Sequence, residues 1–177
     1  PARRACMTSD DTRTPPAPVP SRLPGYLLGT GLGGFVDGIA LHQLAQWHNM
    51  GSAVLPPLTM DAMSKNMRWD GLFHAATWCV VLAGVFLLAR DARRGRMVPG
   101  ARTLAGQLVA GWGAFNLVEG IIDHHLLGLH HVRDLPVHVP TLDWLFLALG
   151  GVALLAGGLW LERTGLARDA RVARQWM

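Results

Sequence analysis

Four long stretches with few charges dominate this sequence and limit the folds that it can adopt. They cover residues 24–47, 70–89, 104–129 and 141–161. Each is close to the roughly 20 residues that an α-helix needs to cross the hydrocarbon core of a bilayer. Lipid cannot satisfy open backbone groups, and the stretches lack the alternating pattern of a β-barrel. The sequence therefore predicts an all-α membrane protein, a bundle of four transmembrane helices.

The positions of the basic residues predict how this bundle is oriented. Of the 16 Lys and Arg residues, 13 lie before residue 23, in the connection 90–103 or after residue 162. The positive-inside rule places these segments in the cytoplasm. We expect a disordered cytoplasmic tail at 1–22, a membrane domain at 23–163 and a basic cytoplasmic tail at 164–177, in an inner (cytoplasmic) membrane. The basic residues thus indicate topology and no nucleic-acid partner.

The third stretch resembles the first when Gly29 is aligned with Gly111, and the fourth resembles the second when Asp70 is aligned with Asp143. In the first of these alignments, eight of the 20 positions from 29 to 48 are identical to their counterparts. The matched polar pairs are Asp37/Glu119, His42/His124, His48/His130 and Asp70/Asp143. These matches predict two duplicated helical hairpins, related by a pseudo-twofold axis along the membrane normal as in parallel-repeat transporters.

Acidic and histidine residues gather in the outer halves of the stretches and in the outer loops. Ionisable residues at membrane depth are costly and usually functional. The predicted metal ligands are His42, His74, His124, Glu119, Asp37, Asp70, Asp123, His48 and His130. Asp143, His125 and Asn116 are predicted to hold the ligands in place. A hydrogen-bond network that only fixes the helices, or a proton path, is the alternative.

Helix geometry restricts which of these residues can share one ion. Asp37 and His42 are five residues apart, about 140° around an ideal α-helix, and so are Glu119 and His124. One ion can take both members of such a pair only if the helix bends at the intervening glycine. We therefore expect either two sites or carboxylates that orient the imidazoles. We also expect His42, His74 and His124 to converge, with Glu119 at the same depth.

Four methionines lie in the first outer loop as the sequence predicts it: Met50, Met60, Met63 and Met67. Thioethers and imidazoles together suit Cu(I), whereas carboxylates suit harder ions. The loop is therefore a candidate point of metal access, and its alternative role is adaptable apolar filling. Copper is the leading cofactor, with zinc, iron or haem as alternatives.

Three motifs resemble a known family. They are Gly-Phe-Val-Asp-Gly-Ile-Ala-Leu-His-Gln at 34–43, Trp-Asp-Gly-Leu-Phe-His at 69–74 and Asn-Leu-Val-Glu-Gly-Ile-Ile-Asp-His-His at 116–125. The chain is similar, over about residues 24–161, to the bacterial predicted-membrane-protein family "domain of unknown function twenty-two forty-three". The resemblance implies a four-span bacterial membrane protein and carries over no activity, cofactor or catalytic residue. An association of the family with respiratory-oxidase assembly adds slightly to the copper interpretation.

Three functions follow from these patterns. The first is a metal-binding protein of the lipid bilayer that handles copper on the outer side, with a respiratory or other membrane complex as partner. The second is an oxidoreductase with a dimetal centre, or with haem between His42 and His124. The third is a non-catalytic subunit whose polar network fixes packing. The sequence has no nucleophile–base pair or phosphate loop, so no catalytic residue is assigned and enzyme activity is left open.

Overall fold

The computed structural model describes residues 19–175, and within this range the chain forms four helices and no strand. The first helix comprises α1 (Leu23–Asp37) and the π-helical segment η1 (Gly38–Ala45), and the second is α2 (Met60–Arg93). The third comprises α3 (Ala101–Glu119) and η2 (Gly120–Leu126). The fourth comprises α4 (Pro140–Leu145), η3 (Phe146–Ala153) and α5 (Leu154–Gln175). The all-α prediction is confirmed. Most of the predicted tail at 1–22 lies outside the described residues.

Two helices extend beyond the stretches that hydropathy predicts. The second begins at Met60, well before residue 70, because the Thr59 side chain accepts a hydrogen bond from the Ala62 N–H at 3.2 Å and caps the helix. Three of the methionines predicted in the outer loop therefore lie on the first turns of α2. The fourth helix continues to Gln175 through the basic segment after residue 163.

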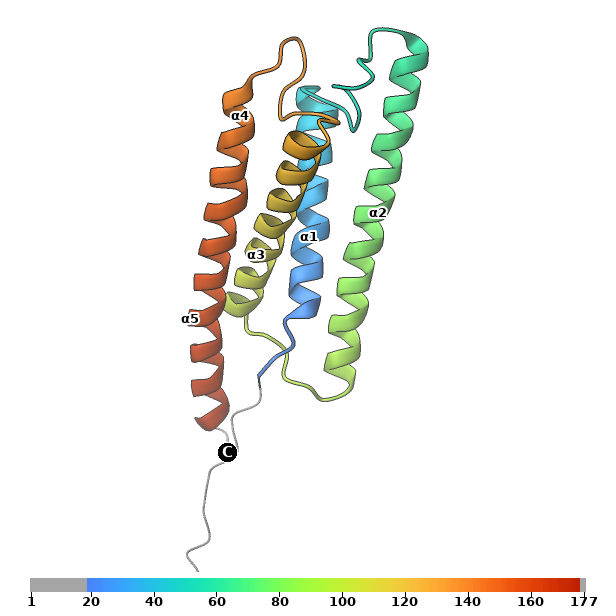
Figure 1. The fold of residues 1–177 in the computed structure, drawn as a ribbon. Coiled ribbons are helices and arrows are strands. Elements are labelled where there is room, and N and C mark those ends of the chain that lie inside the picture. Colours follow the sequence, from blue (N-terminus) through green and yellow to red (C-terminus); the bar gives the residue numbers. More distant parts are fainter. Residues whose placement is uncertain (1–18, 176–177) are drawn as a thin grey trace, which may run out of the picture.

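Helices that follow one another along the chain run in opposite directions, so α1 and α3, which lie side by side in the centre of the bundle, run the same way (Figure 1). A Cβ atom on Gly29 would clash with the carbonyl oxygen of Leu108, and one on Gly111 would clash with that of Tyr26. These two glycines therefore let the α1 and α3 backbones approach closely, as small residues do between membrane helices. The α2 helix packs against α1, and α5 packs against α3.

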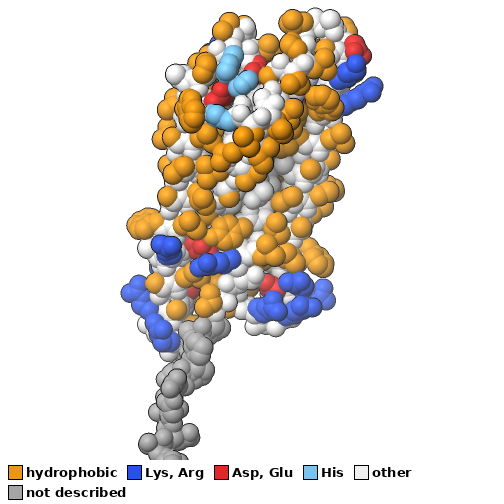
Figure 2. Space-filling view, in the orientation of Figure 1, with side chains coloured by type: hydrophobic (Ala, Val, Ile, Leu, Met, Phe, Trp, Pro, Cys, Tyr) orange, Lys and Arg blue, Asp and Glu red, His pale blue; other side chains and the backbone are white. Residues whose placement is uncertain are grey.

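Polar side chains fill the interior of the bundle, and apolar side chains cover its outside (Figure 2). Among the described residues, sixteen polar or charged residues are buried, whereas the buried apolar residues, glycine and proline aside, are Ala62, Ala110 and Val132. A protein surrounded by water would have the opposite distribution. Two helices, Met60–Arg93 and Pro140–Gln175, are long and apolar enough to cross a bilayer. The apolar exterior therefore suits lipid.

The loops 46–59 and 127–139 lie at one end of the bundle, and α1 begins and α5 ends at the other (Figure 1). Most of the visible basic side chains gather at this second end (Figure 2). The π-helical segments η1 and η2 lead directly into the two loops. This arrangement places the predicted polar cluster at the loop end.

Candidate metal centre

The first and third helices change from α-helix to π-helix at the pairs that lie five residues apart, Asp37/His42 and Glu119/His124. Gly38 begins η1 and Gly120 begins η2, and both segments are π-helical. Hydrogen bonds in a π-helix run from residue i to i+5, so residues five apart become neighbours. His42 Nε2 lies 3.1 Å from Asp37 Oδ2. The helix thus departs from α-helical geometry at the intervening glycine, which is the condition under which Asp37 and His42 can share one ion.

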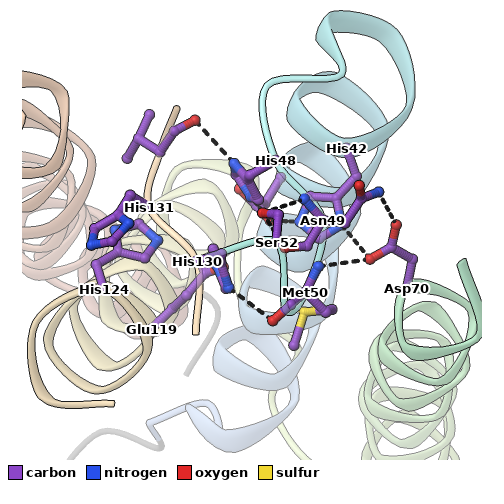
Figure 3. Close-up of polar contacts among 12 residues, drawn as sticks. His42, His48, Asn49, Met50, Ser52, Asp70, Glu119, His124, His130 and His131 are labelled. Atoms are coloured by element: carbon purple, nitrogen blue, oxygen red, sulfur yellow. Dashed lines mark hydrogen bonds and ion pairs between the residues drawn. The ribbon is translucent and has the colours of Figure 1, made fainter. Parts of the chain in front are cut away.

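Two buried trios of possible metal ligands result. The first trio is Asp37, His42 and His48, and the second trio is Glu119, His124 and His130. Within each trio one potential ligand atom per residue lies within 4.8 Å of the others. The trios adjoin, because the His48 and His130 rings stack with centroids 4.6 Å apart and an interplanar angle of 13°. Figure 3 labels His42 and His48 of the first trio and all three residues of the second trio.

Backbone carbonyls fix the orientation of the two central rings. The Nδ1 of His48 lies 2.9 Å from the carbonyl oxygen of Val132, and the Nδ1 of His130 lies 3.2 Å from that of Met50 (Figure 3). A carbonyl oxygen can only accept, so each Nδ1 carries the proton and donates it. The lone pair of each neutral ring is then on Nε2. Metal-binding histidines usually have this arrangement.

Carboxylates face the other two rings. Asp70 Oδ1 lies 3.1 Å from His42 Nδ1, and it also accepts the Met50 N–H at 2.9 Å. The second oxygen of Asp70 accepts from Asn49 Nδ2 at 2.7 Å (Figure 3). Both oxygens of Asp70 are therefore engaged in hydrogen bonds, and the role of Asp70 is to orient the His42 ring.

Asp143 has the corresponding place beside the second trio. Its Oδ1 accepts the Val132 N–H at 2.8 Å and lies 3.7 Å from His124 Nδ1. Asp143 and Val132 are the counterparts of Asp70 and Met50 in the two sequence alignments, so the same contacts recur in the second half of the chain. The carbonyl contacts recur too, between the two halves of the chain. The carbonyl oxygen of Val132 in the second half holds His48 of the first half, and that of Met50 in the first half holds His130 of the second half.

Many polar side-chain atoms of the two trios are buried and have no hydrogen-bond partner. In the described residues, twelve buried side-chain nitrogen and oxygen atoms have no hydrogen-bond partner. Eight of them belong to the trios: Asp37 Oδ2, His42 Nε2, His48 Nε2, both oxygens of Glu119, both nitrogens of His124, and His130 Nε2. An unsatisfied buried polar group costs about 1–3 kcal/mol. A bound cation would satisfy many of these atoms together.

The central rings are in the protonation state that metal binding needs. Burial lowers the pKa of the His48 imidazole to about 4, and the nearby His130 contributes to the same shift. Burial also lowers the pKa of His130 from its usual value near 6.5. Both rings are therefore neutral at pH 7, and neutral imidazole is the metal-binding form.

His74 and Asp123 lie outside both trios. The Nδ1 of His74 bonds to the backbone oxygen of Asp70 at 2.7 Å, and its other edge packs so closely on Gly38 that a Cβ there would clash with Nε2. The expected convergence of His74 with His42 and His124 is therefore not observed. Asp123 is half-buried.

Two residues predicted to support the ligands make their hydrogen bonds elsewhere. The Nδ1 of His125 bonds to the Gly120 carbonyl oxygen at 2.8 Å, and its exposed ring packs edge-on against Trp144. Asn116 donates from Nδ2 to the Gly150 carbonyl oxygen in η3 at 2.9 Å. It thereby supports the π-helical segment of the fourth helix.

The methionines have different surroundings. Met63 and Met67 line a pocket of about 280 Å³ together with His42 and Asp70. Met60 is 82% exposed and does not line this pocket. Met50 acts through its backbone, as described above. Two thioethers therefore lie where the outer surface opens toward the first trio.

Sequence reasoning missed the backbone groups of Met50 and Val132, since a carbonyl carries no side-chain signal. It also missed a buried carboxylate at the opposite end of the bundle. Glu162 is 1% exposed and accepts from Tyr26 Oη at 2.8 Å and Gln107 Nε2 at 3.2 Å. Arg22 Nε lies 3.1 Å from the same carboxylate. The only sequence signal was an acidic residue at the end of an apolar stretch.

A family model described as "Predicted membrane protein (DUF2243)" matches residues 24–165, most of the chain. The chain belongs to this family. The range that the DUF2243 model matches includes both trios, Asp70 and Asp143. The comparisons with curated proteins and with solved structures gave no match.

Proposed function

We propose that this protein is an integral membrane metal-binding protein whose two trios hold a pair of transition-metal ions. One observation carries the proposal. His48 and His130 are held through Nδ1 by carbonyl oxygens, while their Nε2 atoms are buried beside carboxylates and lack partners. His42 likewise has Nδ1 beside Asp70, and its Nε2 makes no hydrogen bond although Asp37 Oδ2 lies 3.1 Å away. Imidazole and carboxylate donors around a closed interior suit a divalent transition metal.

The donor set bears on which metal binds. Imidazoles suit copper, zinc and iron, and two imidazoles with one carboxylate also form the facial triad of non-haem iron. The thioethers of Met63 and Met67 line a pocket together with His42, so an ion that approaches the first trio would meet soft sulfur ligands, which favours copper. Haem fits poorly, because neighbouring imidazole rings lie only 4.4–4.9 Å apart between centroids. We therefore propose copper first, with zinc and iron as the alternatives.

We further propose that the chain crosses a bacterial inner membrane four times and consists of two duplicated hairpins. The apolar exterior, the recurrence of contacts at aligned positions of the two halves and the basic residues near the termini support this topology. Both termini are then cytoplasmic, and the metal centre faces the outer side. A respiratory or other membrane complex is the proposed recipient of the metal.

An oxidoreductase is the second candidate function. Each trio supplies only three ligands, which leaves positions on a metal for an exogenous molecule. A pocket of about 140 Å³ lined by Asp37, Trp112 and Phe146, among others, adjoins the first trio. A small apolar substrate could reach the centre there.

Metal analysis of the purified protein tests the proposal. We expect two bound ions per chain, and we expect His130→Ala to lose metal. His125→Ala is the matched control, because His125 is an exposed histidine of the same helix that leads to His130. Wild-type protein that binds no metal would favour the structural role. An optical change upon reduction, reversed by oxygen, would favour the oxidoreductase.

A further inference from the structure

A third group of possible ligands lies outside the two buried trios, in the second outer loop and at the start of the fourth helix. It consists of His131, His138 and Asp143. The two imidazole rings are tilted by 32° relative to each other, with centroids 3.9 Å apart. His138 Nε2 lies 2.9 Å from Asp143 Oδ2, and His131 Nδ1 lies 2.9 Å from Asp134 Oδ1. Asp134 thus orients His131 and leaves its Nε2 free for a ligand.

In the first half of the chain, the second oxygen of the corresponding carboxylate, Asp70, is held without an imidazole. Asn49, the counterpart of His131 in the sequence alignment of the two halves, donates to the second oxygen of Asp70 at 2.7 Å. His138 makes the corresponding contact with the second oxygen of Asp143. A simple amide is therefore sufficient to hold such a carboxylate. The paired imidazoles of the second half add metal-binding capacity that the fold does not need.

This group is accessible and adjoins the buried centre. The side chains of His131 and His138 are 22% and 40% exposed, and both line a surface pocket of about 280 Å³. Asp143 connects the two regions: its Oδ2 faces His138, while its Oδ1 faces His124 of the second trio. One carboxylate therefore lies between an open pair of histidines and the closed site.

We propose that His131, His138 and Asp143 form an outer, exchangeable site for a divalent cation such as Zn²⁺ or Cu²⁺, from which the ion passes to the second trio. The outer site stands on its own geometry, and the transfer step rests on the proposed function. Two imidazoles and one carboxylate suit such borderline cations. Since the two imidazoles of this group reach the surface, its ion exchanges quickly, whereas an ion inside the buried trios exchanges slowly.

Chelator-driven release of Zn²⁺ from the full-length protein in detergent tests this proposal. The wild-type protein should release zinc in a fast and a slow phase. The double variant His131→Asn/His138→Asn should lose the fast phase and keep the slow amplitude, while reloading its slow phase more slowly than wild type. Asparagine at 138 retains a donor for Asp143, so the fold is preserved, and His131→Asn alone gives a second variant. His125→Asn should keep both phases.

The outcomes separate the two proposals. A fast phase of wild-type amplitude in the double variant, or no fast phase in the wild type, overturns the outer site. An unchanged reloading rate of the slow phase overturns the transfer step. If the slow phase is missing throughout while the double variant abolishes the fast phase, the outer site stands and the buried metal centre fails.

Discussion

Replacing Asp70 by Asn tests whether the carboxylates beside the trios prepare the histidines for metal. Asp70 is buried and accepts from three donors: His42 Nδ1, Asn49 Nδ2 and the Met50 N–H. Asparagine keeps the shape but offers one oxygen, and its NH₂ group faces a donor. Loss of such a hydrogen bond to a metal-binding histidine typically weakens affinity about 10–100-fold. This corresponds to about 1.4–2.8 kcal/mol. One unpaired buried donor should also cost about 1–3 kcal/mol of folding stability.

The assay is competition for Zn²⁺ between the protein and a chromogenic chelator of known affinity. Asp61→Asn is the matched control, because Asp61 lies on the same helix, is 76% exposed and pairs only with Lys65 in the described structure. It removes the same charge but should leave affinity unchanged. Wild-type affinity in Asp70→Asn would refute the reasoning. An equal loss in both variants would attribute the effect to net charge instead of His42 orientation.

Three further predictions concern the bundle. Reporter fusions at both termini should report cytoplasm, because 13 of the 16 basic residues flank that side; a periplasm-active fusion at either end would overturn the topology. Gly29→Ala should destabilise the protein by about 1–3 kcal/mol in thermal unfolding, since its Cβ meets the Leu108 carbonyl oxygen. Gly157→Ala, where a Cβ meets nothing within 4 Å, should not; equal effects would contradict the packing account. Glu162→Ala should lower stability but leave metal content unchanged, and lost metal would show that the two ends are coupled.

Hydropathy and the matched polar residues predicted the helices and most of the buried cluster. Asp37, His42 and His48 were assigned together with their counterparts because charge and imidazole inside apolar stretches are costly. The period of an α-helix placed Asp37 and His42 on different sides of their helix, because that period holds only where the α-helix is unbroken. The π-helical segments begin at Gly38 and Gly120, and nothing in side-chain patterning marks an i to i+5 hydrogen bond.

Other differences come from tertiary contacts that a single sequence does not encode. His74 resembled a ligand by depth, but the close packing of its ring on Gly38 and its bond to the Asp70 carbonyl separate it from the trios. The carbonyls of Met50 and Val132 position the central rings through loop conformation alone. The folding of the second outer loop brings His138 to Asp143, a contact that no spacing in the sequence indicates.

X-ray absorption at the metal edge of the loaded protein tests the central claim most directly. The buried trios contain only imidazole nitrogens and carboxylate oxygens. The spectrum should therefore show a nitrogen and oxygen shell at about 2.0–2.2 Å with the outer scattering of imidazole. Replacing His48 and His130 should reduce that outer scattering, because only one imidazole then remains in each trio. A shell dominated by sulfur, or a spectrum unchanged in the double variant, would contradict the account.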